Sequence, residues 1–444
     1  MPTLIESEEA LENREEASPM KKLFARAIAA PLLLCSFGAL AEDLYSGEKV
    51  TLEMAVWNSV ETYEQINAAL LDRFPEIAAK ADIEVVIEGD GPEGIAQKIR
   101  LLLGSGEDLP DMVRVNYAQF AEFESAGLLY DMTAAVEPYK DDIIPAVLEM
   151  MTGGDGGIYC LPQEAKPKVW YYRTDIFEQA GVDPHEVKTA DDYIEAGRKV
   201  HEATGTWIEN YGTPLNAYDL MMILSGNGAR FTDDNGDFVV ASSQETRDAF
   251  ELLKKYHDSG AFSDIEEWSA DWQAAFTDGT LSSQLIASWM KQHLLTWAPD
   301  QAGKWGCALW PEELQGGSDA GMGIWLVFKN APHAELAADI LAKYSFDPEF
   351  RRAVYAINAV IPPLESAKTD DFYAASDYFD SSLRDVYFEA LEQLSAYPYE
   401  PTFTAEQTII RDYLNEYVNG NISLDDALAQ AEADMKNQIG NAYD

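Results

Sequence analysis

The chain has 444 residues, of which 47% are hydrophobic and 25% are charged, and both shares are ordinary for a globular protein. Its 78 acidic residues outnumber 31 basic ones, so the formal net charge is −47. A field of this sign repels nucleic acid and anionic membrane surfaces, which excludes both as expected partners. The acids are spread along the chain, which favours a solvated acidic surface over a site built to attract a cationic ligand.

The first 41 residues have the anatomy of a secretory leader. Met20 opens a short basic stretch, an apolar segment follows, and Ala39–Ala41 matches an A-x-A cleavage site. The apolar segment is too short to span a bilayer, which needs about 20 residues. We therefore expect a leader at 1–41 that includes a signal peptide at 20–41, no membrane insertion, and a mature protein exported to the periplasm.

Two details of the leader bear on this expectation. Residues 1–19 are acidic and precede the basic stretch, which favours Met20 as the true start over a genuine acidic extension. Cys35 resembles the cysteine of a lipoprotein cleavage box, but the preceding Leu34 is not small, which disfavours lipid attachment. Removal of the leader leaves 403 residues, enough for a large core and for two domains.

Strand and helix patterns alternate through the first part of the mature chain. The predicted strands are 49–57, 83–88 and 112–115, and the predicted helices are 61–74, 94–103 and 118–126. This alternation indicates an α/β unit with a mainly parallel sheet.

The pattern renews after a glycine-rich loop at 153–157. Strands are predicted at 158–161 and 169–172, helices at 175–180, 190–202, 246–259 and 335–344, a hairpin at 231–240, and a helix-rich tail at 372–443. No internal repeat and no low-complexity run interrupts this order.

Motifs of the common enzyme and metal sites are absent. The chain has no Walker A loop, no G-x-S-x-G elbow and no H-E-x-x-H helix, so we predict no catalytic residue and no cofactor. The five histidines lack ligand spacing, and the acidic turn at 233–238 lacks the glycine of an EF-hand, so we predict no metal. Glu266 and Glu267 are adjacent, so their side chains point in different directions, which favours a solvated surface over a glycosidase pair. Whether Cys160 and Cys307 form a disulfide stays open.

Ten tryptophans are the outstanding positive feature of the sequence. Seven of them lie where strands should end or loops begin: Trp57, Trp170, Trp268, Trp272, Trp289, Trp310 and Trp325. An aromatic face packs against the C–H face of a sugar ring, while nearby Asn, Asp and Glu accept its hydroxyl protons. Core packing is the alternative for any one of them, but the group as a whole indicates that some line a cleft.

Several local motifs resemble one family. Leu109–Met112 with Ala126–Thr133 is similar to "LPD…GLL-x-DLT", Gly157–Pro162 to "G-x-I-Y-G-L-P" with Cys160 in place of glycine, Tyr171–Pro184 to "YYN-x-D-x-F-x-x-AG-x-x-P", and Ala275–Leu281 to "F-x-x-G-x-A-A". In this order and spacing they resemble extracellular solute-binding proteins of carbohydrate ABC importers, of the maltodextrin/multiple-sugar-binding type.

This resemblance implies an α/β, periplasmic-binding-protein-like fold with two α/β lobes, a multi-strand hinge and a ligand bound between the lobes, as in a Venus flytrap. The expected lobes are 46–162 plus 288–345 and 163–287 plus 346–444. It also implies a monomer without catalytic activity. Its partners would be a sugar ligand and the transmembrane subunits of an ABC permease with a cytoplasmic ATPase.

The resemblance also supplies candidate ligand-binding residues. They are Trp57, Asn58, Tyr117, Glu164, Lys166, Trp268, Trp272, Trp289, Met290, Gly323 and Trp325. Stacking on the sugar is expected from Trp268, Trp289 and Trp325, and hydrogen bonding to its hydroxyls from Asn58 and Glu164.

Two other functions stay open at this point. A polyamine or another small cationic solute would exploit the negative charge and could occupy an aromatic cage. A secreted carbohydrate-active enzyme would need two carboxylates at a separation that fits the reaction. Sugars of different length are distinguished by a few loop side chains, so the sequence does not name the sugar.

Overall fold

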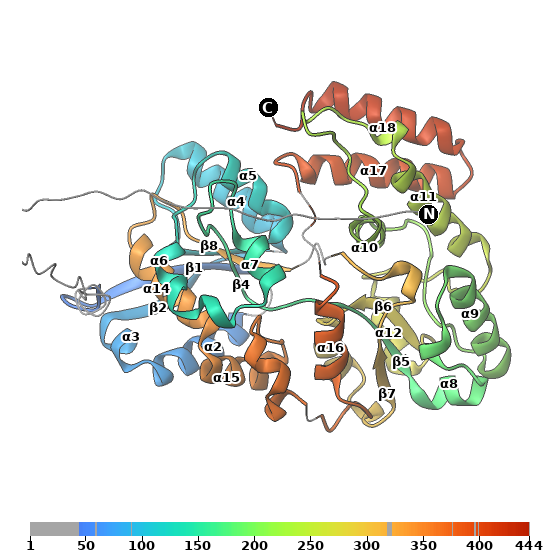
Figure 1. Cartoon of the computed structure of the whole chain (residues 1–444), viewed down its shortest axis with the longest axis horizontal. Helices are drawn as coiled ribbons and strands as arrows, with labels where there is room; N and C mark the ends of the chain where they lie inside the picture. The colour runs from blue at the N-terminus through green and yellow to red at the C-terminus, as the bar shows by residue number, and fades with distance from the viewer. Residues whose placement is uncertain are drawn as a thin grey trace, which may run out of the picture. The chain divides into compact units, whose positions relative to one another are not determined.

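The computed structural model describes residues 44–57, 60–89, 91–317, 322–374, 376–394, 397 and 399–443. These residues belong to one compact unit, Leu44–Asp444. The expected signal peptide at 20–41 and the candidate Asn58 lie outside the described residues. Within the unit, Figure 1 shows two groups of strands, each with its own surrounding helices.

The first sheet has the strand order β2-β1-β3-β8-β4. Its strands are β1 (Val50–Trp57), β2 (Ala81–Gly89), β3 (Met112–Asn116), β4 (Leu161–Pro162) and β8 (Gly323–Leu326). β1 pairs in parallel with β2 and β3, whereas β8 runs antiparallel to both β3 and β4. The last four residues of β1 are all buried, as expected of a strand covered on both faces.

The second sheet has the order β6-β5-β7. Its strands are β5 (Lys168–Arg173), β6 (Ser283–Ala287) and β7 (Trp305–Ala308), and both neighbours of β5 are antiparallel to it. The expected parallel arrangement is thus found among β1, β2 and β3 and not in this sheet. Strand–helix–strand alternation produces parallel neighbours, whereas β6 and β7 return to β5 from more than 100 residues along the chain.

Helices surround both sheets (Figure 1). Before β5 they are α2 (Val60–Arg73), α3 (Pro75–Lys80), α4 (Pro92–Ser105), α5 (Phe120–Ser125), α6 (Thr133–Val136) and α7 (Pro145–Met151). Between β5 and β8 they are α8 (Thr174–Ala180), α9 (Ala190–Thr204), α10 (Ala217–Asn227), α11 (Gln244–Asp258), α12 (Ala270–Asp278) and α13 (Met290–Trp297). After β8 they are α14 (Ala334–Phe346), α15 (Pro348–Asn358), α16 (Leu383–Leu391), α17 (Phe403–Val418) and α18 (Leu424–Gln438).

Local sequence explains where these helices begin. α9, for example, starts with a capping box in which Thr189 and Asp192 each bond the other's backbone N–H. α10 starts at Asn216, whose side chain accepts from the backbone N–H groups of Tyr218 and Asp219. This cap matters for the site, because it places Tyr218 in the first turn of α10.

The boundaries between the lobes stay a prediction. β7 lies in the range 288–345 but pairs with β5, which lies in the range 163–287. α15 follows β8 in the chain and packs against α2. These contacts indicate that the chain passes between the sheets more often than the expected ranges assume.

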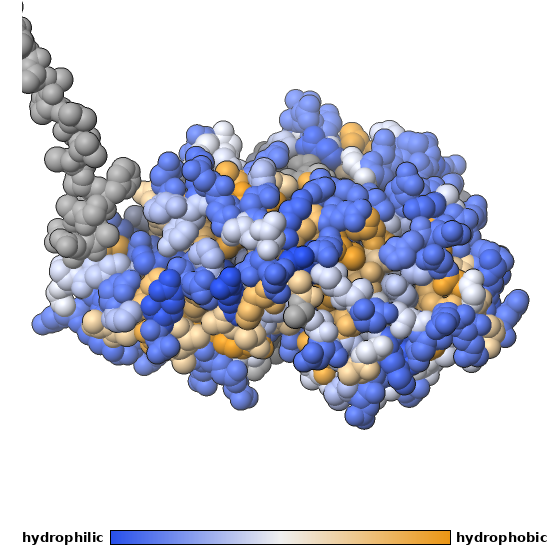
Figure 2. Space-filling view, turned by 60° about the horizontal axis from the view of Figure 1, so that its bottom comes forward, coloured by the Kyte–Doolittle hydropathy of each residue, from blue (hydrophilic) through white to orange (hydrophobic). Residues whose placement is uncertain are grey.

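Hydrophilic residues cover most of the face drawn in Figure 2, with apolar residues scattered among them.

Three expectations about cysteines, metals and membranes can be compared with the described residues. Cys160 and Cys307 are both buried and both free, so the disulfide that the sequence left open is not formed. Among the described residues, the structure places no three His, Cys, Asp or Glu side chains so that they could hold a metal ion. None of the described helices is both long enough and apolar enough to cross a bilayer.

Candidate functional site

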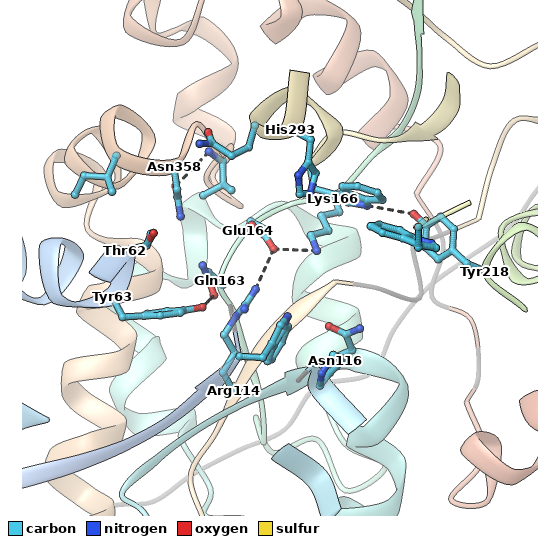
Figure 3. Close-up of a pocket in the computed structure, with 18 residues that line it drawn as sticks. Thr62, Tyr63, Arg114, Asn116, Gln163, Glu164, Lys166, Tyr218, His293 and Asn358 are labelled. Carbon is cyan, nitrogen blue, oxygen red and sulfur yellow. Dashed lines mark hydrogen bonds and ion pairs between the residues drawn. The ribbon is translucent and has the colours of Figure 1, made fainter. Parts of the chain in front are cut away.

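A cavity of about 870 Å³ opens between the ends of β1 and β3 of the first sheet and the helices α10 and α13. Its lining residues are Trp57, Thr62, Tyr63, Gly91, Pro92, Arg114, Asn116, Gln163, Glu164, Lys166, Tyr218, Trp268, Trp289, Gln292, His293, Ile357, Asn358 and Val360. Figure 3 shows that polar and aromatic side chains converge on it from several elements. A volume of this size is typical of a small-molecule site.

One side of the cavity, which we call the polar side, is built on the first sheet. Trp57 ends β1, and the guanidinium carbon of Arg114 on β3 lies 3.5 Å from the centroid of its ring. The hydroxyl of Tyr63 on α2 donates to Oε1 of Gln163 at 3.2 Å. The stack and the hydrogen bond hold these side chains in fixed orientations beside the cavity.

Glu164 is the centre of charge on the polar side (Figure 3). Its Oε1 lies 3.1 Å from Nζ of Lys166 and 3.8 Å from Nη2 of Arg114. The side chains of Glu164 and Arg114 are only 4% exposed, and that of Lys166 is 10% exposed. Burial alone would raise the pKa of the Glu164 carboxyl, but the charges of Lys166 and Arg114 outweigh burial and lower this pKa. The group is therefore an ionised carboxylate between two cations.

The opposite, aromatic side consists of Tyr218, Trp268 and Trp289. The rings of Trp268 and Trp289 are stacked, with centroids 5.2 Å apart and planes inclined by 25°. Nε1 of Trp289 donates to the hydroxyl of Tyr218 at 3.2 Å. Trp268 is 52% exposed, and among the large apolar residues of the described chain only Leu101 is more exposed. This side therefore presents flat apolar surface to whatever enters the cavity.

Trp268 has a backbone φ of 67°, in the left-handed region. This conformation is uncommon for residues other than glycine, asparagine and aspartate and costs of the order of 1 kcal/mol or more. The preceding Glu267 is held by a hydrogen bond from the side-chain amide of Asn216, at the start of α10. Strained backbone conformations of this kind cluster at functional sites.

A half-buried acid pair, Asp219 and Glu267, lies next to the aromatic side. Burial, followed by the nearby charge of Asp219, raises the pKa of Glu267 well above its usual value, against a hydrogen bond from Trp268. Burial likewise raises the pKa of Asp219 to about 7. The expectation that Glu266 and Glu267 form a solvated surface is wrong for Glu267, because its bond to Asn216 draws it inward.

Further lining residues come from α13 and from the end of α15. His293 on α13 has its pKa lowered to about 4 by burial and by the nearby charge of Lys166, so it is neutral at physiological pH. Ile357 and Asn358 are the last two residues of α15, and Val360 lies two residues beyond its end. They add one amide and two apolar side chains to the cavity.

Five of the eleven candidate residues line the cavity, and they are Trp57, Glu164, Lys166, Trp268 and Trp289. Tyr117 packs on Phe120 and Tyr399 instead. Trp272 and Met290 are buried, and Trp272 donates to Asn210 at 3.0 Å. Asn58, expected to bind hydroxyls, lies outside the described residues.

Trp325, expected to stack on a sugar, is fully buried and does not line the cavity. It lies on β8, and its ring meets those of Tyr63 and Tyr344 edge to face at 5.9 and 5.4 Å. A central strand of the first sheet cannot expose this side chain, so its role is core packing. Gly323 supports the site from behind, since a Cβ there would come within 2.6 Å of Nη2 of Arg114.

Sequence reasoning missed thirteen of the lining residues, which are Thr62, Tyr63, Gly91, Pro92, Arg114, Asn116, Gln163, Tyr218, Gln292, His293, Ile357, Asn358 and Val360. Arg114 carried a signal, because it is a lone charge inside the apolar strand 112–115. Asn116 carried another, since it follows the end of that strand as Trp57 ends the first one. The residues at the end of α15 carried none, because only the fold brings them here.

The sequence from α2 to the segment before α16 matches a known family. A family model described as "Bacterial extracellular solute-binding protein" matches residues 69–379. The chain belongs to this family. Members of this family are solute-binding proteins.

Several characterised binding proteins are similar to this chain. An arabinooligosaccharide-binding protein of Halalkalibacterium halodurans is 25% identical over 376 residues, which are 80% of this chain and 81% of that protein. A lactose-binding protein of Rhizobium radiobacter is 25% identical over 379 residues, 81% of this chain and 84% of that protein.

A solved structure supports the fold. The galacto-N-biose/lacto-N-biose I-binding protein of a Bifidobacterium longum ABC transporter, in complex with lacto-N-biose, superposes with a TM-score of 0.72. The match has 22% sequence identity and covers 89% of this chain and 98% of that one. The expected periplasmic-binding-protein-like α/β fold is thereby confirmed.

Proposed function

We propose that this protein is the substrate-binding component of an ABC importer and that it binds a sugar or oligosaccharide in the cavity. One observation carries the proposal: the stacked Trp268 and Trp289 line the same cavity as the buried polar cluster around Glu164. A sugar ring needs both surfaces, because its C–H face is apolar and its edge carries hydroxyl groups.

The names of the relatives support a carbohydrate. They are called arabinooligosaccharide- and lactose-binding proteins, and a structural neighbour holds lacto-N-biose. The cavity volume suits a ligand larger than a single small metabolite. An oligosaccharide is therefore the ligand that we favour.

The rest of the proposed role follows from this assignment. The protein would be exported by the signal peptide at 20–41, act as a monomer in the periplasm and deliver its sugar to permease subunits powered by a cytoplasmic ATPase. It would not be an enzyme. Ligand binding would shift a population of open and closed forms of the two lobes, and the permease would recognise the closed one.

A polyamine is the less favoured ligand. Two cations, Arg114 and Lys166, line the cavity with one carboxylate, so a cationic ligand would meet repulsion there. The large acidic excess of the chain lies outside this lining among the described residues.

A thermal-shift screen of the purified full chain tests the proposal. Saccharides, polyols, amino acids and polyamines are compared, and a ligand at 100 times its Kd stabilises the folded state by about 2.7 kcal/mol. We expect saccharides to raise the melting temperature. A response to polyamines or amino acids alone would contradict the proposal.

A further inference from the structure

The cavity reverses the sign of the chain's charge. Its described ionised lining residues are Arg114, Lys166 and Glu164, two cations against one carboxylate. His293 is neutral beside them. The chain as a whole has a net charge of −47, with 78 acids and 31 bases. A locally positive cavity in such a chain requires a specific explanation.

A third cation strengthens the positive charge from behind. Arg351 on α15 is fully buried, and its charge also acts on Glu164. Its Nε and Nη2 have no hydrogen-bond partner among the described residues, and the same holds for Nε and Nη1 of Arg114. A buried cation without a full set of partners is costly. Among the described residues, Glu164 is the one carboxylate that lines the cavity, and it faces the charges of three cations, so the described lining holds more positive than negative charge.

Resting on the proposed function, we infer that the bound sugar carries a carboxylate, as a uronic acid does, and that Lys166 and Arg114 provide the charge that selects it. Lys166 lines the cavity, so its ammonium group can contact a ligand anion while it keeps its ion pair with Glu164. A uronate would supply the missing negative charge while its ring packs on the aromatic side. A single carboxylate matches the excess of one cation in the lining better than a doubly charged phosphate.

The acidic surface does not prevent this selection. At physiological ionic strength, exposed charges are screened beyond about 8 Å, whereas charges inside a partly buried site are screened much less. The nearby cations of the cavity therefore decide the preference for a bound anion. The distant acids act mainly on the rate at which it arrives.

The alternative is that the cluster binds the hydroxyls of a neutral sugar. Charged side chains form strong hydrogen bonds to hydroxyls, so the Lys166–Glu164 pair alone would serve a neutral ligand. A neutral ligand, however, brings no negative charge to offset the positive charges of Arg114 and Arg351. The two readings differ in one measurable quantity, the ratio of affinities for a uronic-acid oligosaccharide and for its neutral counterpart.

Calorimetric titration of the full chain measures this ratio. Di- and trisaccharides of several linkages are used in matched pairs that differ only in a carboxylate or a CH₂OH at C6. We expect the best uronate to bind at least about tenfold tighter than its neutral counterpart, since tenfold corresponds to about one charge-assisted hydrogen bond. If no uronate binds tighter than its counterpart, the inference fails. The proposed function survives that result if a neutral saccharide binds, and it also fails if no saccharide binds.

Two variants locate the source of the preference. Lys166→Gln removes a cavity cation, and Lys140→Gln removes an exposed one whose weak partner is Glu137, outside the cavity. We expect Lys166→Gln to reduce the uronate-to-neutral ratio about tenfold and Lys140→Gln to leave it unchanged. An equal loss for both members of each pair in Lys166→Gln would overturn the inference. Melting curves of both variants show that the comparison is made on folded protein.

Discussion

The two sides of the cavity are built on opposite principles. On the polar side, Arg114 and Glu164 are almost completely buried and are held by ion pairs and a cation–π stack before any ligand arrives. On the aromatic side, Trp268 is 52% exposed and its backbone is strained. The polar side is therefore part of the core and sets orientation. The aromatic side keeps exposed apolar surface, which gains further stabilisation when a ligand covers it.

The largest expected contrast is between two tryptophans, Trp325 and Trp268. Trp325→Ala leaves a cavity in the core and should lower the free energy of unfolding by about 3–5 kcal/mol. Trp268→Ala should change that free energy by about 1 kcal/mol or less and weaken sugar binding about tenfold, since it removes the stacking surface. Urea unfolding and calorimetric titration measure the two effects.

A loss of affinity in a folded Trp325→Phe variant equal to that of Trp268→Ala would contradict this contrast. Trp325→Phe keeps most of the apolar volume and serves as the matched control for folding.

The ion cluster should come next. Glu164→Gln leaves Arg114 and Lys166 without their shared counter-charge and should cost about 3 kcal/mol of unfolding free energy, near the lower limit for breaking a buried pair. Glu137→Gln removes an exposed carboxylate 3.9 Å from Lys140 and should cost less than about 1 kcal/mol. Equal urea midpoints for the two variants would show that the polar side is not part of the core.

The acid pair beside the aromatic side predicts a pH dependence. Folding raises the pKa of Asp219 from 3.8 to about 7, so the folded state binds the proton more tightly than the unfolded state does. This contribution to stability is complete below about pH 4 and is lost as the pH rises through about 7. Asp219→Asn should flatten this part of the stability profile and make the protein about 2 kcal/mol more stable than the wild type at pH 8.

Urea unfolding between pH 4 and pH 8 checks this prediction. Asp412→Asn is the control, because it removes a carboxylate of an exposed ion pair. A wild-type slope that survives unchanged in Asp219→Asn would contradict the assignment.

The smallest effect concerns the backbone of Trp268. At most positions alanine is more stabilising than glycine, because glycine loses more conformational entropy on folding. With φ at 67°, we expect the opposite order, with Trp268→Gly about 1 kcal/mol more stable than Trp268→Ala. Both should bind sugar with equal, reduced affinity. The usual order of stability would show that this backbone is not strained.

The sequence predicted the local features of this fold well. β1, β2 and β3 were recognised because their periodicity is contained in each segment, and the motifs named the family. The antiparallel pairing of β8 with β3 and of β7 with β5 was not predicted, since these partners lie far apart in the chain. For the site, Trp268 and Trp325 could not be told apart. Both follow polar or glycine-containing segments, and only the sheet determines which of them is covered.

A crystal structure of the full chain with the tightest-binding saccharide of the screen would show whether the sugar contacts both sides of the cavity. We expect one sugar ring to lie against Trp268 and Trp289 with carbon atoms within about 4.5 Å of the ring atoms, and its polar groups to face Arg114, Glu164 and Lys166. A saccharide bound elsewhere, with these two sides of the cavity empty, would contradict the account.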